Sequence, residues 1–173
     1  MTVFGSSTPR PGTPAWDQAY RVGHIVARHG LELVNGGYTG TMEASARGAR
    51  ETGGTAGGVT VRTFTYAEPN PYLSWRMDAP DLLHRLSVLL ELGDLFVVLP
   101  GGTGTLVELG LAWEFLNKGV SGKSILADHV WRPVQDALVP EVRPGLPWPA
   151  NAAPPAREGL FFCEDVAAAL DRF

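Results

Sequence analysis

The sequence has very little cysteine and lysine, and it has no long apolar run. Cys163 is the only cysteine among the 173 residues, so the chain can form neither an internal disulfide nor a cysteine zinc cluster. No apolar run reaches the roughly 20 residues that a membrane-spanning helix needs. A signal peptide would require a basic stretch before its apolar segment, and none precedes the apolar residues at the start of this sequence. We therefore expect a cytoplasmic protein without a membrane partner.

Positive charge is also scarce. The 14 Lys and Arg residues stand against 18 Asp and Glu, a formal net charge of −4, which argues against a nucleic-acid polymer as partner. The four histidines show no metal-ligand spacing, and the sequence predicts neither a metal site nor another cofactor. Apolar residues make up 45% of the chain, enough for a packed core, and the length fits one domain spanning residues 1–173.

Short apolar runs alternate with segments of helical period along the whole chain. Such alternation predicts an α/β protein, a Rossmann-like three-layer sandwich with a mainly parallel sheet. A proline-rich stretch, 142–157, is expected to be a surface loop. The expected strands are 2–4, 31–34, 55–61 with an extension over 62–66, 73–76, 95–99, 124–127 and 160–163, and the expected helices are 15–29, 40–50, 81–92, 105–117 and 164–172.

The most informative segment is a glycine-rich turn between the strand 95–99 and the helix that follows it. It reads Pro100-Gly101-Gly102-Thr103-Gly104-Thr105. Glycine lacks the Cβ atom that would keep a ligand from the backbone, and Thr105 is expected to cap the helix. Free N–H groups and the positive end of a helix dipole suit a phosphate. The domain is therefore predicted to bind a nucleotide or a sugar phosphate.

Two further glycine turns follow earlier strands. Gly5, Ser6 and Ser7 come after the first strand, and Gly36, Gly37, Gly40 and Met42 come after the second or open the next helix. Parallel α/β sheets bind ligands at the carboxyl ends of their strands. We therefore expect all three turns on one rim, around one ligand.

Glu108 has two interpretations. The spacing Thr105-x-x-Glu108 is that of a capping box, in which the glutamate bonds back to the start of its own helix. Alternatively, Glu108 is a carboxylate on the floor of the ligand site, close to the phosphate and facing a ribose. The sequence pattern leaves both open.

Arg85 is the second candidate. In the helix 81–92, His84, Ser87 and Glu91 mark the polar face, and Arg85 falls well off it, beside leucines. A guanidinium there needs an anionic partner or ligand. Alternatively, its stem covers apolar surface while its head reaches water.

Taken together, these residues resemble the LOG ("lonely guy") family, whose members are often mislabelled lysine decarboxylases. Arg85 stands 15 residues before Pro100, where the family has its arginine. The early Gly-Ser-Ser turn is present, and the GGxxGxMEA turn of one subgroup is met from Gly36 to Ala44. The family signature PGGxGTxxE is matched in full by Pro100, Gly101, Gly102, Gly104, Thr105 and Glu108.

The resemblance implies a phosphoribohydrolase that cleaves the N-glycosidic bond of AMP-like nucleoside 5′-monophosphates, giving free base and ribose 5-phosphate. Glu108 would stabilise the cationic sugar of the transition state, and Arg85 would bind phosphate or stabilise charge on the departing base. No metal is needed. The decarboxylase label is excluded, because a pyridoxal enzyme needs a Schiff-base lysine and neither Lys118 nor Lys123 lies in a convincing site.

The resemblance also implies a homodimer or higher homo-oligomer. The apolar helices 81–92 and 105–117 could supply the contact, with residues such as Leu109, Trp113 and Leu116. The alternative function is a non-catalytic nucleotide or molybdenum-cofactor carrier on the same fold. Both functions need the phosphate turn, but only the hydrolase needs Glu108 and Arg85 together.

Overall fold

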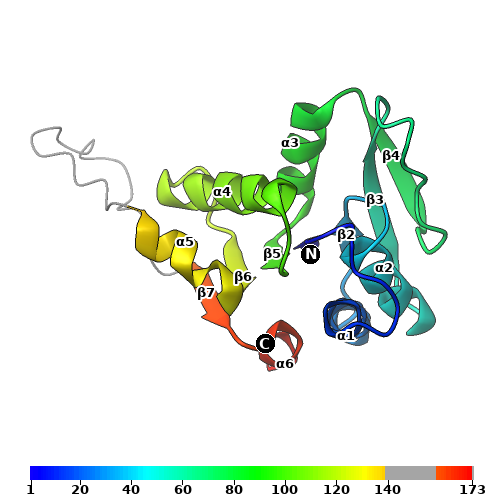
Figure 1. The fold of residues 1–173 in the computed structure, drawn as a ribbon, viewed down its shortest axis with the longest axis horizontal. Helices are drawn as coiled ribbons and strands as arrows, with labels where there is room; N and C mark the ends of the chain where they lie inside the picture. The colour runs from blue at the N-terminus through cyan, green and yellow to red at the C-terminus, as the bar shows by residue number, and fades with distance from the viewer. Residues whose placement is uncertain (139–158, 173) are drawn as a thin grey trace, which may run out of the picture.

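A computed structural model of the chain describes residues 1–138 and 159–172 and contains a seven-stranded parallel sheet (Figure 1). The strand order is β4-β3-β2-β1-β5-β6-β7, and every neighbouring pair is parallel. The α/β fold class is therefore confirmed. The strands are β1 (Thr2–Phe4), β2 (Leu33–Asn35), β3 (Ala56–Val61), β4 (Trp75–Ala79), β5 (Leu95–Val98), β6 (Ser124–Asp128) and β7 (Leu160–Cys163).

The strand order reverses beside β1. The chain builds outward from β1 through β2 and β3 to β4, then returns to place β5 on the other side of β1. In parallel α/β sheets this reversal opens a crevice at the carboxyl ends of the strands, because the connections diverge to opposite faces. The first, second and fifth strands are the ones that precede the three glycine turns.

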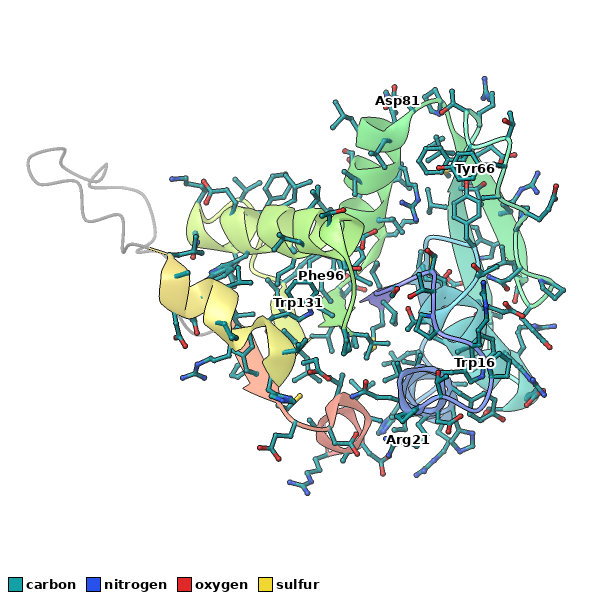
Figure 2. All side chains as sticks on the ribbon, in the orientation of Figure 1. Trp16, Arg21, Tyr66, Asp81, Phe96 and Trp131 are labelled. Atoms are coloured by element: carbon teal, nitrogen blue, oxygen red, sulfur yellow. The ribbon has the colours of Figure 1, made fainter. Side chains whose placement is uncertain are left out.

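Helices cover both faces of the sheet (Figures 1 and 2). One face packs against α1 (Pro14–Arg28), α2 (Thr41–Glu51) and α6 (Val166–Leu170), and its core includes Trp16. The other packs against α3 (Leu82–Leu92) and α4 (Thr103–Asn117), with Phe96 and Trp131 between the layers. Successive strand residues alternate between the two cores, as β geometry requires: Val3 joins the first and Phe4 the second.

Several predicted boundaries were wrong. The segment 62–66 does not extend a strand, and β4 begins two residues later than expected. The helix α5 (Arg132–Ala137) was not predicted. The proposed loop at 142–157 lies outside the described residues. Within the described residues, no helix is both long enough and apolar enough to cross a bilayer.

Candidate functional site

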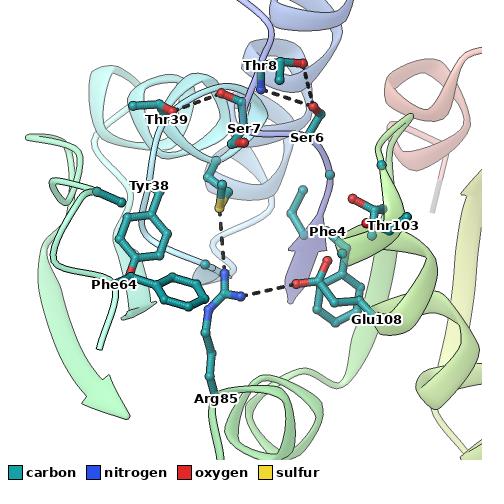
Figure 3. Close-up of a pocket in the computed structure, with 18 of the residues that line it drawn as sticks. Phe4, Ser6, Ser7, Thr8, Tyr38, Thr39, Phe64, Arg85, Thr103 and Glu108 are labelled. Carbon is teal, nitrogen blue, oxygen red and sulfur yellow. Dashed lines mark hydrogen bonds and ion pairs between the residues drawn. The ribbon is translucent and has the colours of Figure 1, made fainter. Parts of the chain in front are cut away.

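A cavity of about 670 Å³ lies at the carboxyl edge of the sheet (Figure 3). Its wall includes residues from all three glycine turns, as the sequence predicted, and from the loop between β3 and β4. The predicted residues that line it are Gly5, Ser6, Ser7, Gly36, Met42, Arg85, Gly102, Thr103, Gly104, Thr105 and Glu108. The strand-order reversal therefore brings together segments that are far apart in the sequence.

The N-terminus of α4 opens onto this cavity. Gly102 is the N-cap residue and supplies no side chain to bond the helix amides. The first turn of a helix has N–H groups without intrahelical partners, and here these belong to Thr103, Gly104 and Thr105. A Cβ atom at Gly102 or Gly104 would meet nothing within 4 Å. The helix start is thus exposed to a ligand on its open side, which suits an anion.

Pro100 and Gly101 do not line the cavity. A Cβ atom on Gly101 would collide with the side chain of Thr105. This glycine therefore lets the turn close against the helix, whereas Gly102 and Gly104 keep its outer side open.

The predicted cap at Thr105 is wrong. The helix begins at Thr103, two residues earlier than expected, and Thr105 is a buried residue of its first turn. Glu108 therefore lies in the second turn, too far along to close a capping box with the N-cap Gly102. Of the two interpretations of Glu108, the capping box is wrong, and the residue lines the cavity, as the second interpretation requires.

Glu108 and Arg85 form an ion pair on the cavity wall (Figure 3). The Arg85 Nη1 atom lies 3.9 Å from Glu108 Oε1, and each residue is only 8% exposed. Arg85 comes from α3 and Glu108 from α4, which cover the same face of the sheet. The guanidinium does not extend into bulk water. The alternative interpretation, in which the Arg85 side chain only covers apolar surface and ends in solvent, is therefore wrong.

Three contacts fix the guanidinium. Its Nε atom donates to the carbonyl oxygen of Val59 at 2.8 Å, and Nη2 donates to the Met42 sulfur at 4.0 Å. Its Cζ atom lies 5.8 Å from the centre of the Tyr38 ring, within range of a cation–π interaction. Arg85 is therefore held in place by the protein before any ligand arrives.

The Glu108 carboxyl titrates close to neutrality. Burial raises its pKa from 4.5 to about 7, because the charged form is poorly solvated there, and the nearby Arg85 opposes part of this rise. A group with such a pKa holds or releases a proton readily at neutral pH. Perturbed carboxyls of this kind gather at functional sites.

The turn after β2 supports the ion pair through Gly36. A Cβ atom there would occupy the place of the Arg85 Nη2 atom and would press on the Met42 sulfur. Gly37 and Gly40 do not line the cavity but have positive φ angles of 79° and 71°. These two glycines shape the turn. Gly36 makes room for the Arg85 side chain, and Gly40 for the backbone of Ser6 and Ser7.

The turn after β1 is fixed to the turn after β2. The Ser6 carbonyl accepts hydrogen bonds from the Thr41 amide at 2.8 Å and from its hydroxyl at 3.0 Å. The Ser7 carbonyl accepts one from Thr39 Oγ1 at 3.0 Å, and the Ser6 hydroxyl bonds the Thr8 hydroxyl at 2.8 Å. Backbone carbonyls thus hold the wall together and leave hydroxyl groups at the cavity surface (Figure 3).

Comparison with known proteins decides the family. Residues 1–128 match the family described as LDcluster4, the SLOG cluster4 family. The chain belongs to the SLOG cluster4 family. The resemblance to LOG proteins noted in the sequence is thereby confirmed.

Three curated relatives of this SLOG protein carry the name cytokinin riboside 5′-monophosphate phosphoribohydrolase. The one from Rhodococcoides fascians is 31% identical over 176 residues, which covers 98% of this chain and 86% of the relative. The one from Mycobacterium tuberculosis is 35% identical over 115 residues, covering 65% of this chain and 62% of the relative. The chain therefore shares most of the length of the first relative.

Solved structures support the same fold. The X-ray structure of TM1055 is 32% identical with a TM-score of 0.62, covering 72% of this chain and 71% of the other. The molybdenum cofactor binding protein from Rippkaea orientalis has a TM-score of 0.73 at 15% identity, covering 99% and 91%. At that identity, the second likeness concerns the fold alone.

Sequence reasoning missed one part of this SLOG cavity. Tyr38, Phe64 and Tyr66 line it, as do Arg10 and Glu68. Phe64 and Tyr66 belong to the segment expected to continue a strand, but in the structure this segment is a turn after β3, and both residues line the cavity. The signal available was composition, because two aromatic residues stand close together in a segment rich in turn-forming residues.

Proposed function

We propose that this protein is a phosphoribohydrolase that cleaves the N-glycosidic bond of AMP-like nucleoside 5′-monophosphates. One observation carries the proposal: the buried Arg85–Glu108 pair lies on the wall of the same cavity as the free start of α4. A binding site for phosphate alone has no need for a buried carboxylate, since a nearby negative charge weakens anion binding. A hydrolase of ribosides does need one, because its transition state carries positive charge on the sugar.

The start of α4 would hold the 5′-phosphate. The amides of Thr103, Gly104 and Thr105 supply donors, and the helix dipole adds a favourable potential. Glu108 follows on the same helix, one turn further in. A phosphate bound at the helix start therefore brings the attached ribose toward the Glu108 carboxylate.

The Glu108 carboxylate would stabilise the ribosyl cation as the bond to the base breaks. The interaction is stronger in the transition state than with the neutral ribose, and this difference is what accelerates a reaction. The same carboxylate can orient the attacking water and take up its proton. Arg85, held beside it, would stabilise negative charge on the departing base or bind the phosphate.

The relatives support this reading, since the names of the Rhodococcoides and mycobacterial proteins specify a riboside 5′-monophosphate and a phosphoribohydrolase. The proposal keeps the part of that name that the cavity chemistry matches: a 5′-phosphate, a ribose and a glycosidic bond. AMP is the first substrate to test.

We also propose that the protein is a homodimer. The residues first named for the contact were partly wrong, because Leu109 and Leu116 are buried in the core of their own chain. Other apolar side chains of α4 are exposed instead: Leu106 at 39%, Val107 at 48% and Phe115 at 36%. Sedimentation at micromolar concentration tests this, and a monomer would contradict it.

The activity test is direct. The protein is incubated with AMP and with a panel of other nucleoside monophosphates, and free base and ribose 5-phosphate are measured by chromatography. We expect release of base from at least one purine monophosphate and none from the corresponding nucleoside, which lacks the phosphate. Tight binding of nucleotide without any release would instead favour a carrier on this fold.

A further inference from the structure

We propose that Tyr38, Phe64 and Tyr66 form an aromatic wall that stacks the base of the nucleotide, with Phe64 as its central face. The inference rests on the proposed function and extends it from the sugar phosphate to the base. It assigns a role to the part of the cavity that the sequence motifs do not cover.

The order of groups along the cavity matches the order of groups in a nucleotide. The start of α4 comes first, and Glu108 follows on the same helix. Arg85 is next, 3.9 Å from Glu108, and the Tyr38 ring lies 5.8 Å beyond its guanidinium carbon. Figure 3 shows Arg85 between Glu108 on one side and Tyr38 and Phe64 on the other. Phosphate, ribose and base would therefore meet the helix start, the ion pair and the aromatic wall in turn.

The Phe64 ring contacts both of the other rings of the wall. The centres of Tyr38 and Phe64 are 6.1 Å apart, and those of Phe64 and Tyr66 are 5.4 Å apart with their planes 29° from parallel. Tyr38 is buried, Phe64 is half-buried and Tyr66 is 82% exposed. The wall thus runs from the interior to the rim, and it offers flat apolar surface next to the charged pair.

The buried end of the wall, at Tyr38, is also held in position. The Tyr38 hydroxyl accepts a hydrogen bond from the Val61 amide at 2.8 Å. Asn70, which is 6% exposed, ties the β3–β4 loop to the turn after β2. Its amide donates to the Gly37 carbonyl at 2.9 Å, and its side-chain nitrogen donates to the Tyr38 carbonyl at 3.0 Å. A surface built in advance loses little entropy when a base stacks on it.

Stacking on an aromatic ring acts on the base and not on the sugar or the phosphate, and it tolerates different bases because all have a flat face. The wall therefore predicts a preference for nucleotides over the sugar phosphate alone. Loss of one stacking ring weakens binding by about tenfold.

The test compares AMP with ribose 5-phosphate. Calorimetric titrations use a Glu108→Gln protein, so that turnover does not consume the AMP, with and without the further change Phe64→Ala. Phe161→Ala is the matched control, because Phe161 is 45% exposed on β7 and does not line the cavity. We expect Phe64→Ala to weaken AMP binding about tenfold while ribose 5-phosphate binding stays unchanged. Phe64→Tyr should keep the affinity for AMP.

A second measurement does not depend on the folding of any Phe64 variant. In NMR spectra of AMP with the protein, the adenine H2 and H8 signals should move upfield, as protons do above an aromatic ring. Phe64→Ala with full AMP affinity, or adenine signals that do not move upfield, would overturn the wall and leave the proposed function standing. A protein that binds neither AMP nor ribose 5-phosphate would overturn both.

Discussion

The Arg85 guanidinium and the Glu108 carboxylate lie 3.9 Å apart, each on its own helix and each 8% exposed. This separation is longer than a close hydrogen bond, so the pair is near contact without being locked together. The carboxylate keeps lone pairs for a ligand, and the guanidinium is fixed mainly by Val59 and Met42. Both side chains therefore line the cavity in the arrangement that the proposed reaction requires.

Glu108→Gln should abolish most hydrolysis while phosphate-dependent binding persists. The amide keeps the size of the side chain but removes the charge that stabilises the ribosyl cation, so kcat should fall by a factor on the order of 10² or more. Initial rates with AMP and a separate titration give the two values. Glu114→Gln is the control, because Glu114 lies on the same helix in an exposed pair with Lys118. Wild-type turnover in Glu108→Gln would end the catalytic assignment.

The rate of hydrolysis should follow the ionisation of Glu108. Its pKa is raised to about 7, so kcat/KM should rise with pH below that value and level off above it. Ionisation of the substrate phosphate falls in a similar range, with a pKa of about 6. Arg85→Ala separates the two causes. This change removes the charge that lowers the Glu108 pKa. The increase in kcat/KM should therefore occur at higher pH, and its maximum value should be lower. A rise at the same pH in both proteins would assign it to the substrate.

The free energy of unfolding should depend on pH through the same group. The folded protein holds the Glu108 proton up to pH about 7, whereas the unfolded chain releases it near 4.5, so folding takes up a proton between these values. Wild-type stability should therefore fall as pH rises through this range, by on the order of 3 kcal/mol from this residue. Glu108→Gln cannot titrate. Its stability relative to wild type should increase from pH 4 to pH 8, measured by urea unfolding, and Glu114→Gln should show a flat difference.

Gly102→Val should abolish phosphate binding and leave the fold intact. A Cβ atom at this position meets nothing in the protein, and the backbone there has φ −94°, which valine adopts freely. The added methyl groups would fill the space above the helix start where the phosphate approaches. Titration with ribose 5-phosphate and a thermal melt give the two readouts. Gly122→Val is the control, since Gly122 also has open space around it and lies away from the cavity. Retained binding would place the phosphate elsewhere.

The fold could be predicted from the sequence because its signals are local and repeated. Apolar runs such as 95–99 and helical periods such as 81–92 agree with the parallel sheet and its covering helices. The first residue of a helix was harder to predict where a glycine-rich turn allows the helix to begin at any of several residues. Thr105 looks like a cap from its residue type, but the backbone enters the helix at Thr103, because Gly102 satisfies the N-cap geometry without a side chain.

The site could be predicted only where it depends on local patterns in the sequence. The rim of glycine turns follows from strand alternation, and Arg85 could be singled out because it lies off the polar face of its helix. The contact between Arg85 and Glu108 depends on how α3 and α4 lie on the sheet, and no local pattern contains that. The contact between Phe64 and Tyr38 joins the β3–β4 loop to the turn after β2. The bonds from Asn70 to the Gly37 and Tyr38 carbonyls connect the same two segments, which lie over thirty residues apart in the sequence.

The absence of a side chain at Gly36 couples this position to the distant Arg85. The room that its missing Cβ leaves is taken by one nitrogen of Arg85. A relative with any larger residue at position 36 must therefore hold its arginine differently or do without it. The two positions should consequently vary together during evolution, so that a larger residue in the turn after β2 marks relatives in which the arginine is placed differently or lost.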